Sequence, residues 1–130
     1  MKVVFDTNLF VASYWNEKSS SRKIIQLAKS NHLKVIWSKD LLEEAEFILK
    51  RINVSRGYFK LIRSIYKLED QVFPKNQINI VSDYSDNRLL EASEEGNADF
   101  LITSDRELLK VGRFGETKII KPSDFLSVII

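Results

Sequence analysis

The sequence predicts an α/β fold in which a parallel sheet carries helices on both faces. Short apolar runs rich in β-branched residues alternate with longer segments whose apolar residues recur at the helical period. Strands separated by helices in this way usually pair in parallel, with the helices packed on the sheet. The chain of 130 residues shows no internal repeat, linker or low-complexity segment, so we expect one domain over residues 1–130.

Each predicted strand is a short apolar run. The first, residues 2–5, leads directly into Asp6 with no turn residue between them. A segment at 78–81 reads either as a short edge strand or as an extended approach to the next helix. The other predicted strands cover residues 34–37, 100–103 and 117–120.

The predicted helices are recognised by apolar residues at the helical period and by their end signals. Ser38 is a plausible N-cap, Pro74 follows a helix that it cannot continue, and Gly96 with Asn97 supplies a left-handed stop. Residues 9–15 form a short helix or a wide turn. Three further helices are expected at about 21–30, 39–51 and 55–69. Another begins within residues 82–86 and stops at Gly96, a short one holds Leu108 and Leu109, and the last begins at Pro122.

Composition narrows the class of protein. Hydrophobic residues make up 44% of the chain, which is typical of a globular protein, and cysteine is absent. Met1 precedes the first strand without a signal-peptide pattern, and no apolar run approaches the roughly 20 residues that cross a membrane. We therefore expect a cytoplasmic protein without a membrane partner. A net charge of +2 is too balanced to indicate a nucleic-acid partner by itself.

Four acidic residues are expected at one rim of the sheet. Asp6 and Asp105 each follow a predicted strand, and parallel strands end at the same edge. Glu44 lies in the second turn of the helix after the second strand, and Asp86 lies in the first turn of a later helix. Because helices begin where parallel strands end, all four carboxylates can converge.

Each of these acids also has a purely structural explanation. Asp86 could complement a helix dipole, and Asp105 could be an N-cap. Glu44 could be a surface acid, since Glu43 and Glu46 lie beside it. At about 100° per residue, Glu44 and Glu46 flank the apolar stripe of their helix on opposite sides, so periodicity does not choose between them.

Convergence of the four carboxylates would require a cation. Carboxylates that come together repel one another, and burying them without a partner is costly. A ligand set made only of oxygen atoms favours Mg²⁺ or Mn²⁺ over zinc. Such a site is suited to phosphoryl chemistry, because the metal activates water and neutralises charge on the phosphate.

The order and spacing of these motifs resemble the PIN-domain family, in particular its small VapC-like toxins of toxin–antitoxin pairs. The resemblance spans nearly the whole chain. It is carried by residues 3–8 (VVFDTN), 38–44 (SKDLLEE), 83–92 (DYSDNRLLEA) and 98–105 (ADFLITSD).

The resemblance implies a three-layer α/β/α fold with a mainly parallel sheet and metal-dependent cleavage of RNA. It also implies an antitoxin protein as partner and suggests a homodimer. Position by position, it assigns the metal and catalytic roles to Asp6, Glu44, Asp86 and Asp105, and so selects Glu44 over Glu46. Thr7, Asn8 and Thr103 would support the site, and Asp83 falls at a position that is often acidic in the family.

Other functions remain to be weighed. A haloacid-dehalogenase-type phosphatase needs an acid where this chain has Asn8, and a receiver domain needs adjacent acids after the first strand, which Thr7 and Asn8 do not provide. Two alternatives within the resemblance stay open. One is a PIN nuclease outside toxin–antitoxin systems, and the other is a non-catalytic PIN scaffold that binds a protein or RNA.

A basic face is expected on the helix at 55–69. Four cations recur there at helical spacing, namely Arg56, Lys60, Arg63 and Lys67. They form either an ordinary solvated face or a rail for RNA phosphates beside the acids, whose own charge would repel a polyanion.

Overall fold

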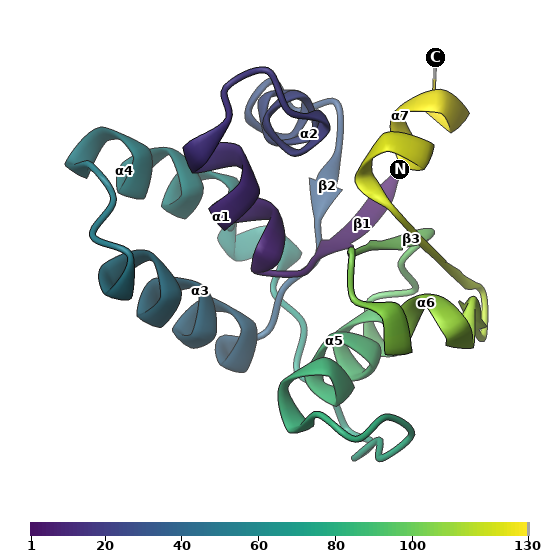
Figure 1. The fold of residues 1–130 in the computed structure, drawn as a ribbon. Coiled ribbons are helices and arrows are strands. Elements are labelled where there is room, and N and C mark those ends of the chain that lie inside the picture. The colour runs from purple at the N-terminus through teal and green to yellow at the C-terminus, as the bar shows by residue number, and fades with distance from the viewer. Residues whose placement is uncertain (130) are drawn as a thin grey trace.

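A five-stranded sheet forms the centre of the computed structural model, which describes residues 1–129 (Figure 1). The strand order is β2-β1-β3-β5-β4, and every neighbouring pair is parallel except β4 with β5. The strands are β1 (Lys2–Phe5), β2 (Lys34–Val35), β3 (Phe100–Ile102), β4 (Arg113–Phe114) and β5 (Thr117–Ile120).

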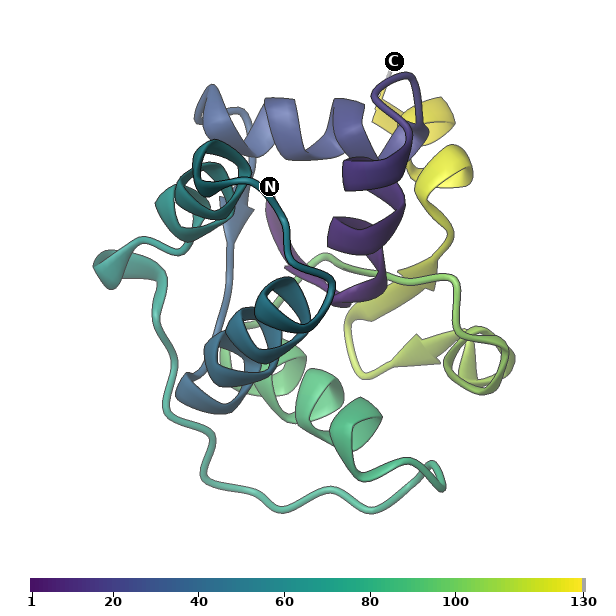
Figure 2. The same cartoon turned by 60° about the vertical axis from the view of Figure 1, so that its left-hand side comes forward.

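Helices cover both faces of this sheet, which confirms the predicted three-layer α/β/α fold (Figures 1 and 2). One face carries α1 (Asn8–Trp15), α2 (Ser20–Lys29), α3 (Lys39–Arg51), α4 (Arg56–Ile65) and α7 (Pro122–Ile129). The other face carries α5 (Tyr84–Glu95) and α6 (Arg106–Val111), and the first residues of α3 also reach it. No helix in residues 1–129 is long and apolar enough to cross a membrane.

The strands are apolar throughout because both of their faces are buried. Along β1, Val3 and Phe5 point into the core under α1 and α2, while Val4 points into the core under α5. In β3, Leu101 and Ile102 divide between the two cores in the same way. This alternation fixes the register, because a slip of one residue would exchange the two faces.

The chain reverses its direction of travel across the sheet between β1 and β3. β2 lies on one side of β1 and β3 on the other, with Phe5 opposite Ile102. Beyond β1 the chain enters α1 on one face, and beyond β3 it enters α6 on the other face. Diverging connections leave a crevice at the carboxyl ends of the two strands, which is where open α/β sheets bind their ligands.

The helix predicted at 55–69 ends earlier than expected, so the prediction that Lys67 lies on it was wrong. α4 stops at Ile65, and a 3₁₀ turn follows at Leu68–Asp70. The Tyr66 ring packs edge-on against Phe10 and Trp37, and the indole N–H of Trp37 donates to the carbonyl of Lys67 at 2.7 Å. These contacts hold Tyr66 and Lys67 outside the helix, so α4 ends well before Pro74.

Other boundaries also differ from the sequence prediction. β2 ends at Val35, and Trp37 forms only a single parallel bridge to Gln71. Residues 78–81 form no strand, because side chains of α5 bind their backbone: Ile78 N–H donates to the Glu91 carboxylate at 2.8 Å. The antiparallel strand β4 was not predicted, since two residues between glycines carry no periodic signal.

Two glycines allow a test of this packing. A Cβ atom added to Gly96 would overlap Cγ2 of the buried Ile36, whose branched side chain has little freedom to move away. A Cβ atom at Gly57, inside α4, would meet nothing within 4 Å. We expect Gly96→Ala to destabilise the fold by about 1–3 kcal/mol, as overpacking does. Gly57→Ala should instead be neutral or stabilising by up to about 1 kcal/mol. Urea denaturation of both variants checks this, and a shift in the same direction for both would contradict it.

Candidate functional site

Asp6 is the first residue beyond β1 and lies at the crevice between β1 and β3, where only 5% of it is exposed. The Thr103 hydroxyl donates to Asp6 Oδ2 at 2.7 Å, and the Asn8 backbone N–H donates to Oδ1 at 3.3 Å. Burial raises the pKa of Asp6, these hydrogen bonds lower it, and the negative charge of Asp105 raises it further. The carboxyl group is therefore fixed in position but poorly solvated.

Thr103 also ties Asp6 to the second acid of the rim. Its hydroxyl oxygen accepts from the Asp105 backbone N–H at 3.0 Å while its hydrogen goes to Asp6. Asp105 caps α6, with Oδ1 accepting from the Leu108 N–H at 3.0 Å. The N-cap role that was considered for Asp105 is thus confirmed, and it occupies Oδ1. Within residues 1–129 the other oxygen accepts no hydrogen bond, so capping does not prevent it from binding a cation.

Asp86 and Glu44 complete the group from the adjoining helices. Asp86 lies buried in the first turn of α5, and burial, followed by the charges of Asp105 and Asp6, raises its pKa to about 7. Glu44 is half-buried in α3; burial and then the charges of Asp6 and Asp83 raise its pKa, while a hydrogen bond with Ser85 lowers it. The structure therefore brings together the four acids expected from the sequence, Asp6, Glu44, Asp86 and Asp105, which we call the acid cluster.

Glu46 points away from the acid cluster. Its Oε2 lies 2.8 Å from Nη1 of Arg63 on α4. Glu46 is thus engaged with α4, whereas Glu44 lies near enough to Asp6 for that charge to raise its pKa after burial does. The metal role of Glu44 stays a prediction.

The supporting residues act mainly through the backbone and as helix caps. Thr7 is buried and precedes α1 without a side-chain capping bond, and Asn8 is exposed and contributes its backbone N–H. Asp83 caps α5 by accepting from the Ser85 N–H at 2.8 Å, and its charge also raises the pKa values of Asp86 and Glu44. Of this group, Thr103 has the most direct contact with the acid cluster.

Two residues near the acid cluster could not be identified from the sequence. The first is Asn87, 2% exposed, which accepts from the N–H groups of Ile80 and Val81 and donates to the carbonyls of Val81 and Asp83. It thus fixes the chain that leads into α5, and its only signal in the sequence was a polar residue directly after Asp86.

The second such residue is Tyr66, which directly follows α4. Burial, followed by the charges of Glu44 and Asp6, raises the pKa of its phenol. The hydroxyl therefore stays protonated near the acid cluster, where it can donate a hydrogen bond.

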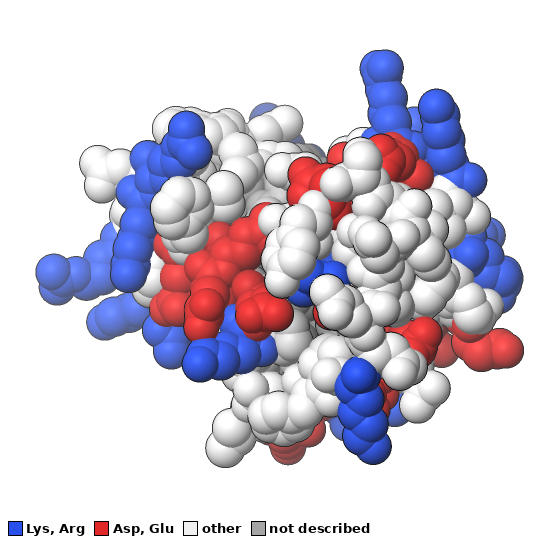
Figure 3. Space-filling model, turned by 90° about the horizontal axis from the view of Figure 1, so that it is seen from below, with Lys and Arg blue, Asp and Glu red and all other residues white. Residues whose placement is uncertain are grey.

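The donor set of the acid cluster suits a hard divalent cation. Like charges raise the pKa values of Asp6, Glu44 and Asp86, and a cation would relieve that repulsion. In the part of the chain that the structure describes, no three acidic or histidine side chains lie close enough together to hold one ion as they stand. A shared ion would therefore require the carboxylates to close on it. Acidic side chains do gather into a patch on the face in Figure 3, with Lys and Arg side chains at its edge.

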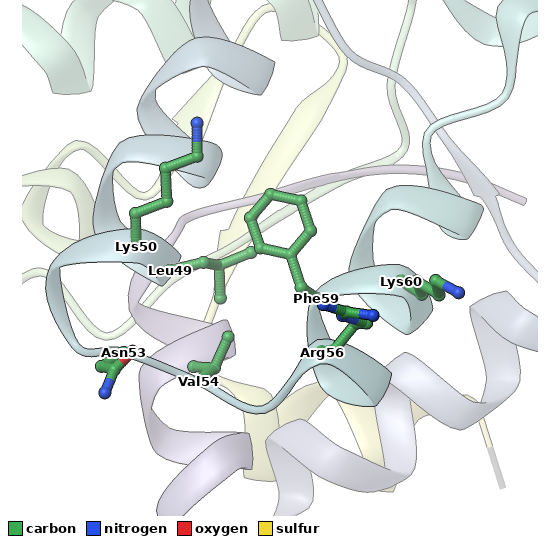
Figure 4. Close-up of a pocket in the computed structure, with 7 residues that line it drawn as sticks. All are labelled: Leu49, Lys50, Asn53, Val54, Arg56, Phe59 and Lys60. Carbon is green, nitrogen blue, oxygen red and sulfur yellow. The ribbon is translucent and has the colours of Figure 1, made fainter.

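The four cations of the predicted rail are not equivalent. Arg63 is paired with Glu46, and the ammonium group of Lys67 contacts the amide oxygen of Asn31. Arg56 and Lys60 instead line a hollow of about 640 Å³ between α3 and α4 (Figure 4). Lys50 lies on its rim, and its apolar lining comes from Leu49, Val54 and Phe59.

Comparison with known proteins shows similarity to a family model, to a relative in sequence and to a solved structure in fold. A family model described as PIN domain matches residues 2–107. The protein MJ1680 of Methanocaldococcus jannaschii, itself uncharacterised, is 24% identical over 117 residues, which cover 85% of this chain and 75% of the relative. The fold is similar to a chain in the crystal structure of VapBC2 from Rickettsia felis bound to a DNA fragment from their promoter. That match has a TM-score of 0.55 and 15% identity, and covers 93% of this chain and 98% of the other.

The raised pKa of Asp86 predicts how stability depends on pH when no metal is bound. Its pKa is about 7 in the folded protein and near 3.8 in the unfolded chain, so the folded state holds the proton more tightly. Stability is therefore greatest at acid pH and is lost as pH rises toward 7. In chelator, we expect the melting temperature to fall between about pH 5 and about pH 8.

Asp86→Asn should flatten this fall, and Mn²⁺ should flatten it by binding the folded state. The exposed Asp124, also in the first turn of a helix, provides the control, because Asp124→Asn should keep the wild-type slope. A melting temperature that rises with pH in chelator would contradict the assignment of Asp86 to a repelling cluster.

Proposed function

The chain belongs to the PIN-domain family, and on this premise we propose that it is a metal-dependent endoribonuclease that acts as the toxin of a toxin–antitoxin pair. The observation that supports this most strongly is the proximity of four carboxylates, Asp6, Glu44, Asp86 and Asp105, which lie near enough to the ends of β1 and β3 to act on one another electrostatically. The proposed substrate is RNA, and the proposed cofactor is Mg²⁺ or Mn²⁺ held by these four side chains.

The metal would supply Lewis-acid activation of water and neutralisation of the phosphate. The protein residues keep the carboxylates in place. Thr103 fixes the orientation of Asp6 and the backbone of Asp105, and Asn87 fixes the chain that carries Asp83 into α5. His32, the single histidine of the sequence, is exposed between α2 and β2, outside the acid cluster. General-base catalysis by histidine therefore has no support here.

The toxin role is supported by the motifs and by the similarity in fold to a VapBC2 chain, which at 15% identity concerns the fold alone. We propose an antitoxin protein as partner, a homodimer as the assembly and the cytoplasm as the location. A PIN nuclease outside such pairs would have the same acid cluster. A small DNA-binding protein encoded by the neighbouring gene would distinguish the two. A non-catalytic scaffold is disfavoured, because none of the four acids is replaced.

We further propose that RNA extends from the acid cluster along α4. The ion pair of Arg63 with Glu46 joins the last turn of α4 to α3, two residues from Glu44. Arg56 and Lys60 lie nearer the start of α4, beside the hollow in Figure 4. Within residues 1–129 neither Arg56 nor Lys60 forms an ion pair, so both cations are available to phosphates.

Neighbouring acids on α3 give the sharpest test of the catalytic assignment. We expect Asp6→Asn and Glu44→Gln each to reduce metal-dependent cleavage of single-stranded RNA by about 100-fold or more, the scale seen when one preorganised electrostatic group is removed. Glu46→Gln removes the same charge two residues away and should retain activity within a few-fold. Initial rates in Mn²⁺, with folding checked by circular dichroism, measure this. Loss of cleavage in Glu46→Gln with normal cleavage in Glu44→Gln would show that the motif is assigned out of register.

Charge reversal tests the path along α4. The double variant Arg56→Glu and Lys60→Glu should weaken RNA binding and flatten its dependence on salt by roughly one unit of slope for each phosphate that is no longer neutralised. The control is Arg113→Glu with Lys118→Glu, an exposed pair on β4 and β5 with the same change in net charge. Equal effects of the two double variants on affinity and slope would show that only total charge matters.

A further inference from the structure

Tyr84 is an aromatic residue that stays exposed beside the acid cluster. It is the first residue of α5, and 68% of it is exposed. The guanidinium carbon of Arg88 lies 4.0 Å from the centre of its ring. A cation on one face of a tyrosine ring attracts the ring and holds it in place. The exposed area therefore belongs mainly to the opposite face and the edge.

Arg88 is itself firmly held. It is buried, its Nη2 donates to the carbonyl of Ile78 at 3.1 Å, and the same atom lies 2.5 Å from Glu91 Oε2. Its Nε has no hydrogen-bond partner in residues 1–129, and its guanidinium carbon lies over the Tyr84 ring. The ring thus rests on a rigid, positively charged support.

The ring borders a hollow of about 340 Å³ whose lining is mostly polar and includes Asp40, Asn76, Gln77 and Arg88. Asp40 lies one turn before Glu44 on α3, and Ser85, the residue after Tyr84, is close enough to Glu44 to lower the pKa of its carboxyl group, which burial raises. The hollow therefore lies at the start of α3, one turn from Glu44, whereas the hollow between α3 and α4 lies at the end of α3.

We propose that Tyr84 is a positioning residue that stacks on a nucleobase of single-stranded RNA next to the acid cluster. This inference rests on the proposed function and deepens it. A base needs a flat, accessible ring face, and Tyr84 provides one that is already fixed. The hollow carries charges of both signs, because Lys75 and Arg88 line it as well as Asp40 and Glu91, and Glu91 is already paired with Arg88. The Asp40 carboxylate and the amides of Asn76 and Gln77 can hydrogen-bond the edge of a base that stacks on the ring.

Binding of octameric oligoadenylate and oligouridylate RNA tests the inference. Fluorescence anisotropy with Ca²⁺ in place of Mg²⁺ reads binding, and a gel of the same samples verifies that the RNA is intact. Tyr84→Ala should weaken oligoadenylate binding by about 5- to 100-fold, the range expected when one stack is removed. The slope against salt should not change, because every phosphate keeps its cationic partners. Tyr84→Trp should bind at least as tightly as wild type. Phe73→Ala removes a ring that is 72% exposed but does not line the hollow, and it should have no effect.

The outcomes separate this inference from the proposed nuclease activity. If wild type cleaves RNA but Tyr84→Ala binds as wild type does, the stacking role is wrong and the nuclease stands. If wild type cleaves nothing but Tyr84→Ala still weakens binding, the stacking role stands and the nuclease fails. If Tyr84→Ala instead changes the oligomeric state in sedimentation without changing affinity, the ring is a protein contact and the inference is overturned. Failure of wild type to bind either RNA overturns it as well.

Discussion

The burial of Asp6 among other carboxylates is the constraint on which the site depends. A carboxylate removed from water and surrounded by like charges is unfavourable in its ionised form. In this protein the cost is offset by the Asn8 N–H, two residues along the chain, and by the Thr103 hydroxyl, which reaches Asp6 because β1 pairs with β3. The register of two strands thus sets both the position of Asp6 and the electrostatic need for a cation.

Helix N-termini stabilise three further carboxylates near Asp6. Asp105 caps α6, Asp83 caps α5, and Asp86 lies in the first turn of α5. Positive potential at a helix N-terminus stabilises each of these carboxylates. The structural and functional explanations of these residues therefore do not compete, because the same feature that makes an acid a good cap also directs it toward the crevice at the strand ends. A fold whose helices begin at that rim can gather acids there at modest cost to its stability.

The sequence was sufficient where a residue's position follows from local periodicity, and insufficient where distant contacts decide it. Asp6 and Asp105 could be placed because each follows an apolar strand, and parallel strands end together. Glu44 could not be distinguished from Glu46 by periodicity, since the deciding contact is with Arg63 on another helix. Lys67 was placed on a helix that Trp37 ends, through a hydrogen bond between residues 30 positions apart. The bonds of Asn87 to residues 80–83 are likewise tertiary and leave no periodic signal.

The surfaces on the two sides of the acid cluster differ in a way that suits the two parts of a nucleotide. On the α4 side, Arg56 and Lys60 carry positive charge that attracts phosphates. On the α5 side, the positive charge of Arg88 is buried beneath the Tyr84 ring and paired with Glu91, so that side presents an aromatic ring beside a hollow of mixed charge. A single strand crossing the acid cluster would gain from backbone contacts on one side and from base contacts on the other. A duplex, whose bases are already stacked and paired, could gain only the first, so this asymmetry favours single-stranded RNA.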